Sequence, residues 1–271
     1  MELRPTTEGD LPAVHATFVD AVGSVFRPHG FAAPAPSEAV FSTLHRHLME
    51  TGICVVAEED GEVVGFGTSW TRDDDWFLAC LFVRERAQGA GVGPQLLDAV
   101  WSDARNRRTV TDAIQPVSNV VYGRRGLLPA TPLLTFTGRP KLRGASSAAE
   151  TPADIAAIDA AVYGFDRSVD HRYWERHARR TEWGDAYSYV FPGGDFGTVA
   201  GLTPAAAARA LEAELARSDE SIRVRIPGSS RALVEVALRA RLRLGDVPGF
   251  VLLSDGLEPP TALAPSGYML F

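Results

Sequence analysis

The sequence predicts an α+β protein with mixed sheets, built from two related halves. Some apolar runs typical of strands follow one another across short turns, and others are separated by segments with the helical spacing of apolar residues. The order hairpin, helix, strand, helix, strand occurs twice. With 271 residues the chain can form two domains of ordinary size. We expect domains over 1–140 and 150–271, with a linker within Gly138–Glu150, where turn formers, small residues and charges gather.

The first half is predicted to begin with a strand and two helices. A short strand over Glu2–Pro5 precedes apolar residues at helical spacing in Leu11–Val22. The proline-rich stretch 28–36 is a loop, after which Ser37 has the residue type of a helix N-cap and Gly52 ends the second helix.

An antiparallel meander is predicted next, because an Asp-Gly pair at 60–61 marks a hairpin. It leads into a glycine-rich turn over Arg86–Gly93 and a helix that contains Leu96 and Val100. The predicted strands are Ile53–Ala57, Val63–Trp70, Trp76–Val83, Val110–Ile114 and Leu133–Thr137, with a short helix over Ser118–Tyr122 before the last of them.

The second half is predicted to follow a similar plan. Its expected elements are helices at Ile155–Val162 and His171–Arg180, a hairpin of Tyr187–Phe191 with Phe196–Ala200, a helix at Pro204–Ala216, a strand at Ser221–Ile226, a helix at Ser230–Leu242 and a strand at Phe250–Ser254.

Composition excludes several classes of protein. The formal net charge of −7 argues against nucleic acid or an anionic membrane as the partner, since neither is attracted by the overall field. Cys54 and Cys80 lie in apolar runs, which indicates free buried thiols and a cytoplasmic protein. We expect no targeting or membrane-spanning segment. We also expect no metal site, because the histidines lack metal-ligand spacing; His45 and His47 are only two residues apart.

The glycine-rich turn carries the strongest chemical signal. Glycines at 89, 91 and 93 allow main-chain N–H groups to turn toward one centre, and a helix that starts there adds the positive end of its dipole. Such a site suits a pyrophosphate. The preceding strand belongs to an antiparallel meander and the turn has no lysine, so neither a dinucleotide-binding fold nor a Walker loop fits. The alternative is a turn that serves only close packing.

These residues resemble the GCN5-related N-acetyltransferase (GNAT) family. The similarity is carried by the run LFVRERAQGAGVGPQLL at 81–97, in which Gln88, Gly91 and Gly93 meet the family's Gln/Arg-x-x-Gly-x-Gly/Ala motif. Glu85 stands where members often have proline. The resemblance implies mostly antiparallel sheets flanked by helices, acetyl-CoA as a cosubstrate and no metal. It implies cofactor binding by Leu81, Phe82, Val83, Gln88, Gly89, Ala90, Gly91, Val92, Gly93, Pro94 and Asn119.

Tyr122 is the catalytic candidate that the resemblance implies. It stands before a Gly-Leu turn, where the family places a tyrosine that protonates the departing CoA thiolate. A phenol, with a reference pKa of about 10, holds a proton for this step at neutral pH. The alternative is that the ring only packs at a helix interface. Asn119 also has the residue type of a helix N-cap.

The resemblance implies that a small-molecule primary amine attacks the thioester directly. Carboxylates that could act as the base cluster at two hairpins, but such runs are typical of solvated turns, so the sequence assigns no base; they are Asp73, Asp74, Asp75, Glu58, Glu59 and Glu62. Two alternatives stay open. The chain could be a non-catalytic acyl-CoA sensor or interaction module, or it could use another acyl group or an alcohol or thiol acceptor.

The second half resembles a degenerate GNAT copy. Its segment 196–204 occupies the place of the meander strand and loop, but the glycine motif is missing and the helix begins with Pro204. We therefore expect one CoA site, in the first half, and a monomer or homodimer. An Asp166–Arg167 pair is expected to hold a helix end, and the alternative is that this segment faces the active cleft.

Overall fold

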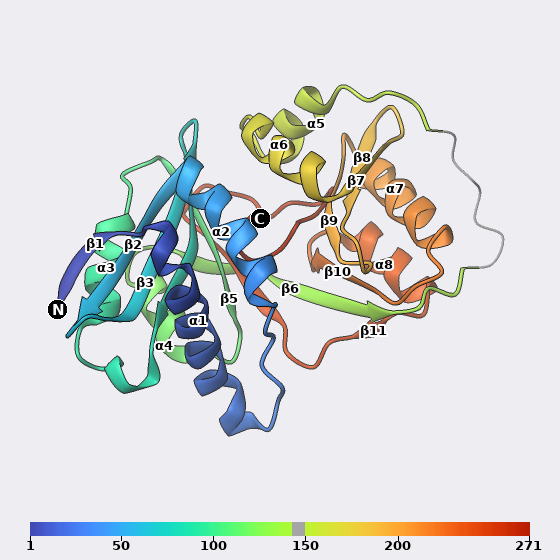
Figure 1. The fold of residues 1–271 in the computed structure, drawn as a ribbon. Helices are drawn as coiled ribbons and strands as arrows, with labels where there is room; N and C mark the ends of the chain where they lie inside the picture. The colour runs from blue at the N-terminus through green and yellow to red at the C-terminus, as the bar shows by residue number, and fades with distance from the viewer. Residues whose placement is uncertain (143–149) are drawn as a thin grey trace. The chain divides into compact units, whose positions relative to one another are not determined.

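The structure is a computed structural model that describes residues 1–142 and 150–271 (Figure 1). The central part of the predicted linker, 143–149, lies outside the described residues. The described chain forms two compact units. The first contains Met1–Thr109 and Ile114–Arg125, and the second contains Val110–Ala113 and Gly126–Phe271.

The division runs through strand β5 (Asn106–Asp112) and differs from the predicted domain limits. Strand β6 (Leu128–Gly138), which we assigned to the first domain, belongs to the second unit. Its partners explain this, since β6 pairs antiparallel with the later strands β10 (Ile222–Pro227), β11 (Arg243–Leu244) and β12 (Gly249–Leu253). Periodicity in a sequence identifies a strand but not the neighbour with which it pairs.

The first unit contains a meander with a parallel addition. Strands β1 (Glu2–Pro5), β2 (Gly52–Glu59), β3 (Glu62–Arg72) and β4 (Asp75–Val83) pair antiparallel in chain order. Strand β5 then pairs parallel with β4. The helices of this unit are η1 (Glu8–Asp10), α1 (Leu11–Phe26), η2 (Arg27–His29), α2 (Glu38–Thr51), η3 (Glu85–Ala87), α3 (Val92–Val100) and α4 (Pro116–Gly123). The predicted elements of this region are therefore present, most of them longer than expected.

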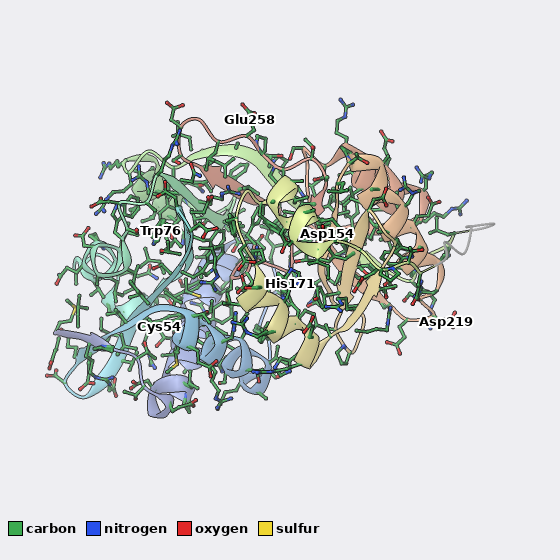
Figure 2. All side chains as sticks on the ribbon, turned by 90° about the horizontal axis from the view of Figure 1, so that it is seen from above. Cys54, Trp76, Asp154, His171, Asp219 and Glu258 are labelled. Carbon is green, nitrogen blue, oxygen red and sulfur yellow. The ribbon has the colours of Figure 1, made fainter. Side chains whose placement is uncertain are left out.

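Local chemistry accounts for several of these limits. The Ser37 hydroxyl accepts from the N–H of Val40 and so caps α2, as expected. Cys54 and Trp76, labelled in Figure 2, lie on the strands of this unit. Cys54 and Cys80 are both free and buried, and burial raises the pKa of the Cys54 thiol to about 11.

The second unit contains a separate antiparallel sheet besides the strands around β6. This sheet has the order β13 (Leu263–Ala264), β9 (Phe196–Gly201), β8 (Ala186–Val190), β7 (Arg179–Glu182). Its helices are α5 (Ile155–Val162), α6 (Ser168–His177), α7 (Pro204–Ala216) and α8 (Arg231–Arg239). The predicted charged helix His171–Arg180 lies three residues too far along the chain, because the chain turns at Ala178 and residues from Arg179 pair with β8 instead.

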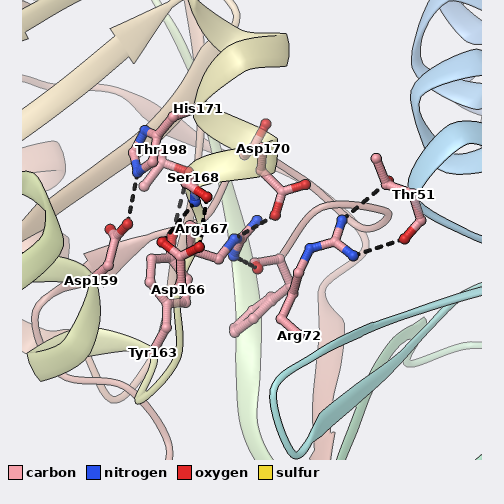
Figure 3. A network of polar contacts seen from close by, with 12 residues as sticks. Thr51, Arg72, Asp159, Tyr163, Asp166, Arg167, Ser168, Asp170, His171 and Thr198 are labelled. Carbon is pink, nitrogen blue, oxygen red and sulfur yellow. Dashed lines mark hydrogen bonds and ion pairs between the residues drawn. The ribbon is translucent and has the colours of Figure 1, made fainter.

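Buried polar groups tie α5 and α6 to the sheet of this unit (Figure 3). His171 lies between the Asp159 carboxylate at 2.7 Å and the Tyr189 hydroxyl at 2.9 Å. An Asp–Arg pair does hold the start of α6, but it joins Arg167 to Asp170 at 2.8 Å. Asp166, expected in this role, accepts instead from the hydroxyl and N–H of Ser168.

Arg167 is fully buried in this network. Its guanidinium lies 4.5 Å from the ring centroid of Tyr163 and 4.9 Å from that of Trp174, and it also donates to the Phe271 carbonyl at 2.5 Å. Such a buried cation is tolerated because it is paired with a carboxylate, donates to a carbonyl and lies against aromatic rings.

The predicted fold class is confirmed: the architecture is mixed, with largely antiparallel sheets flanked by helices. Across the described ranges, no helix combines the length and the apolar character that crossing a membrane requires.

Candidate functional site

Helix α3 of the first unit is held close against β3, and this fixes the loop before it. A Cβ on Gly65 would lie 2.9 Å from a methyl carbon of Leu96 and 3.1 Å from the Phe82 carbonyl oxygen. A side chain at this position would therefore push the helix away from the sheet. Leu96 is fully buried and Val92 nearly so, in a cluster with Ala57 and Val64. The start of α3 consequently has a defined position above the end of β4.

The loop over Gln88–Gly91 makes its turn with glycines in the left-handed region. Gly89 and Gly91 both have φ of +81°, and Gly91 is the N-cap of α3. Side chains rarely adopt this conformation, so the sequence requires glycine here. A Cβ on Gly89 would meet nothing within 4 Å, and a Cβ on Gly91 only the Gln95 amide nitrogen at 3.9 Å. The space beside the loop is open.

This arrangement can bind an anion. The N–H groups of the first turn of an α-helix have no partners within the helix, and the helix dipole is positive at that end. At α3 these groups belong to Gly91, Val92 and Gly93, since Pro94 has none. Together with an open glycine turn they form a cradle for phosphate oxygens.

Strand β4 opens away from β5 just before the loop. The parallel pairing begins at Asp75 opposite Asn106 and its last pair is Leu78 with Thr109, while β4 continues to Val83. After Leu78, the main-chain N–H and C=O groups on the β5 side of β4 are thus not used in pairing with β5. Leu81, Phe82 and Val83 lie on this half-buried stretch. Polar groups of an extended ligand could pair with such a strand edge.

Gln88 connects the loop to this strand. Its amide nitrogen donates to the Val83 carbonyl at 3.0 Å and contacts the Ser24 hydroxyl at 3.5 Å.

At Glu85, where members of the family named above often have proline, the main-chain N–H donates to Asp20 at 2.8 Å, which a proline could not do. Asp20, Arg84, Glu85 and Arg86 line a cavity of about 300 Å³ beside the loop.

Tyr122 of α4 belongs to the same unit and is buried. Burial raises the pKa of its phenol well above the usual value, although a hydrogen bond with Ser118 opposes this, and the Cys80 thiol lies close enough to add to the rise. Cys80 is on β4, two residues past the end of the pairing with β5. Tyr122 is thus a protonated phenol whose neighbour Cys80 lies on the opened stretch of β4.

Asn119 is not a helix cap, contrary to the expectation from its residue type. Helix α4 begins at Pro116 with Gln115 as its N-cap, so Asn119 lies inside the first turn. Its amide nitrogen donates to the Gln115 carbonyl at 2.8 Å. The proline at the first helical position, which suits that place, is the signal that could have located the start.

Comparison with known proteins identifies this half of the chain. Residues 23–121 match the Acetyltransferase (GNAT) family, a range that includes α2, strands β2 to β5, the glycine loop and most of α4. Residues 23–121 are a GNAT acetyltransferase domain. The chain is accordingly an enzyme of the acetyl-CoA-dependent acyltransferase type. No curated protein sequence matches it.

Solved structures show that the fold of the whole chain is shared. A candidate acetyltransferase from Pyrococcus horikoshii is 17% identical, has a TM-score of 0.80 and matches over 100% of this chain and 95% of that one. A GCN5-related N-acetyltransferase from Sphaerobacter thermophilus is 15% identical, with a TM-score of 0.62 over 95% and 97% of the two chains. At these identities the likeness concerns the fold.

In the GNAT domain, the carboxylates that were considered as bases do not form one solvated group. Asp73 and Asp74 are exposed, but Asp75 is buried and pairs with Arg108 at 2.5 Å and with the Asn106 amide at 3.0 Å. Its role is therefore to join the starts of β4 and β5.

Most of the glutamates at the other hairpin also have cationic partners. Glu58 pairs with Arg4 at 2.7 Å, and Glu62 pairs with Arg86. Pairs of this kind on a surface contribute little to stability and occupy the carboxylates.

One titratable carboxyl was missed in the sequence. Asp112 is the last residue of β5, and its pKa is raised from 3.8 to about 6, mainly by burial, while a hydrogen bond from the Tyr268 hydroxyl lowers it. Its sequence signal is a lone carboxylate in the predicted strand Val110–Ile114, which periodicity alone does not separate from an ordinary edge residue.

The histidines do not suggest a metal. His45 is buried against Phe41 and Phe66, and burial lowers its pKa to about 4, so the ring is neutral. Within residues 1–142 and 150–271, no group of three or more potential ligands is arranged around a common point.

The second unit lacks the glycine cradle at the corresponding helix. Helix α7 follows β9 as α3 follows β4, but its N-cap is Thr203, whose hydroxyl accepts from the N–H of Ala206 at 3.1 Å. The first turn is thus capped by the chain itself. A larger cavity of about 880 Å³ in this unit lies at the other end of α7, beside Arg217 and the paired Arg179 and Glu214.

Proposed function

We propose that the chain transfers an acetyl group from acetyl-CoA to a primary amine of a small molecule by direct attack. The observation that carries this proposal is the open glycine turn at the start of α3, directly after a strand whose edge is free of β5. The glycine turn suits a pyrophosphate, and the free strand edge suits an extended pantetheine arm.

Each predicted site residue has a role in this proposal. The main-chain N–H groups of Gly89, Ala90, Gly91, Val92 and Gly93 bind the pyrophosphate, and Pro94 fixes the first helical turn without competing as a donor. The main chain of Leu81, Phe82 and Val83 pairs with the pantetheine arm and supplies donors to the tetrahedral oxyanion. Gln88 holds the Val83 carbonyl, and Asn119 steadies the start of α4 beside the cofactor.

Tyr122 is proposed as the acid that protonates the CoA thiolate. Its raised pKa keeps the phenol protonated at neutral pH, and its neighbour Cys80 lies on the opened part of β4. A group that holds its proton until the thiolate develops suits this step.

We infer further that the second unit is a degenerate GNAT copy that binds no CoA of its own, since its element order matches and its glycine cradle is missing. The net charge of −7 supports a cationic small molecule as acceptor, rather than nucleic acid or an anionic membrane. Free buried thiols support a cytoplasmic location, and we propose a monomer or homodimer.

Thermal unfolding with and without acetyl-CoA tests the site. A ligand at 100 times its Kd adds about 2.7 kcal/mol of stability, which gives a visible rise in Tm. Gly91→Glu places a negative charge where the pyrophosphate is expected and should abolish the rise. Gly30→Glu is the matched control, because Gly30 also has positive φ and open space around it but lies outside the loop.

A thiol-release assay with a panel of small primary amines then tests the reaction. Release of CoA that depends on the amine supports acetyl transfer. A Tm rise that Gly91→Glu removes, without release for any amine, alcohol or thiol acceptor, would indicate an acyl-CoA sensor. No Tm rise in the wild-type protein would contradict the proposed site.

A further inference from the structure

The cavity beside the glycine loop of the first unit has four charged side chains in its wall. It has a volume of about 300 Å³, and its lining residues are Asp20, Arg84, Glu85 and Arg86. Arg84 directly follows Val83, the last residue of the opened stretch of β4. A cavity of this size is at the lower end of the range for small-molecule sites. It therefore suits a small charged ligand next to the strand that we propose for the pantetheine arm.

Two of these four charges are used by ion pairs with residues that do not line the cavity. Glu85 pairs with Arg27 at 2.6 Å, and Arg86 pairs with Glu62. One cation and one carboxylate of the wall are left without an ionic partner within the described ranges 1–142 and 150–271. These two side chains are available to a charged ligand.

Arg84 is the cation that is left, and its guanidinium is held in place. Its main-chain N–H donates to the Val64 carbonyl at 2.8 Å, and its Nε donates to the Thr17 hydroxyl of α1 at 3.1 Å. That hydroxyl is buried and donates its own proton to the Ala13 carbonyl at 2.8 Å. The two terminal amino groups of the guanidinium have no partner in the described part of the chain. Such a fork matches the two oxygens of a carboxylate.

Asp20 is the carboxylate that is left. It lies on α1, and its Oδ2 accepts from the main-chain N–H of Glu85 at 2.8 Å. This bond holds the carboxylate at the wall of the cavity, while Oδ1 has no partner among the residues that the structure describes. An ammonium group is a suitable donor to this oxygen. Asp20 and Arg84 do not pair with each other, so the cavity presents the two opposite charges separately.

This arrangement of charges selects among ligands. A phosphate of CoA would be attracted by Arg84 and repelled by Asp20, whereas a simple diamine would be attracted by Asp20 and repelled by Arg84. A head group that carries an ammonium and a carboxylate on one carbon satisfies both side chains.

We propose that this cavity binds the α-amino-acid head group of the acceptor, and that the acceptor is a small diamino acid. This rests on the proposed function. Arg84 binds the α-carboxylate and Asp20 binds the α-ammonium, while the amine at the far end of the acceptor extends toward Leu81–Val83. Two ammonium groups and one carboxylate make such an acceptor net cationic, which agrees with the cationic acceptor that the net charge of −7 supports.

The far amine is the group that becomes acetylated. It first loses one proton to water, and its lone pair then forms the bond to the acetyl carbon. The carbon–sulfur bond breaks and its electrons pass to sulfur. A second proton of the nitrogen ends on the CoA sulfur, so the products are the amide and free CoA thiol.

The test compares acceptors that differ only in the head group, with CoA thiol release as the measurement. The probes are diaminopropionate, diaminobutyrate, ornithine and lysine, each beside the diamine of the same chain that lacks the carboxylate. For at least one length, kcat/KM of the diamino acid should exceed that of its diamine by about 10- to 100-fold, the usual contribution of hydrogen bonds to a charged group. Diamines that react as well as the diamino acids at every length would overturn the inference.

Two variants assign the charges. Arg84→Gln should lower kcat/KM for the best diamino acid by about 10- to 100-fold and change it little for the matching diamine, with an unchanged Tm rise on binding acetyl-CoA. Asp20→Asn keeps an oxygen for the Glu85 N–H and loses the negative charge. It should raise KM more for the diamino acid than for the amino acid of the same chain that lacks the α-ammonium.

Arg105→Gln is the matched control, because Arg105 is an exposed arginine of the same unit that does not line the cavity, and it should change neither rate. If Arg84→Gln slows the diamino acid and the diamine equally, the assignment is wrong while acetyl transfer stands. If it removes the Tm rise with acetyl-CoA, Arg84 serves CoA binding and the assignment is also wrong. If the wild-type protein releases no thiol with any amine, the proposed function fails, and this inference fails with it.

Discussion

Replacing Asp112 by asparagine should stabilise the protein at neutral and alkaline pH. The folded protein holds the carboxyl proton more tightly than the unfolded chain, since the pKa rises from 3.8 to about 6. The stabilising contribution of the protonated form is therefore complete below pH 3.8 and is lost as the pH rises through about 6. Asparagine does not ionise and can still accept from Tyr268, so the variant avoids this loss.

The size of the effect follows from the shift. A change of one pKa unit corresponds to 1.36 kcal/mol, so a shift of about two units sets an upper limit of roughly 3 kcal/mol. Because the Asp112 side chain is partly exposed, solvent screening makes the effect smaller than this limit. We expect the free energy of unfolding of Asp112→Asn to exceed that of the wild-type protein by about 1 to 2 kcal/mol above pH 7.

The measurement is chemical denaturation of both proteins at several pH values between 4 and 8. The difference in the free energy of unfolding should grow with pH between about 4 and 7 and then level off. A difference that stays constant across this range would refute the reasoning, because a constant term reflects packing and not ionisation. A variant less stable than the wild-type protein at pH 8 would also refute it.

Four further substitutions test the two units separately. Tyr122→Phe should leave the Kd for CoA unchanged in a binding titration and slow turnover on the order of 100-fold, and equal turnover would exclude its acid role. Gly201→Ala should destabilise the protein by more than about 2 kcal/mol in denaturation experiments, because the new Cβ would lie 2.5 Å from the Ala207 nitrogen. Gly193→Ala, with positive φ but open space, should cost only about 1 kcal/mol. Arg167→Met should cost about 3 to 5 kcal/mol, since it leaves a buried carboxylate without its cation, and a loss below 1 kcal/mol would contradict this.

The sequence predicted the parts of the site that depend on local chemistry. Gly89 and Gly91 are required where the chain turns in the left-handed region, and this requirement can be read in any sequence. The meander strands were visible because an apolar period of two and an Asp-Gly turn are local signals. Short elements such as β7 were missed, since pairing with β8 overrides the charged character of Arg179–Glu182.

What the tertiary structure decided concerns contacts between residues far apart in the chain. Periodicity shows that β6 is a strand, but only pairing with β10 and β12 assigns it to the second unit. The burial that raises the pKa of Asp112, and the hydroxyl of Tyr268 that orients it, come from segments more than a hundred residues away. Backbone conformation is a property of a few neighbouring residues, whereas burial and the affinity of a carboxyl for its proton are set by whatever the fold packs around it.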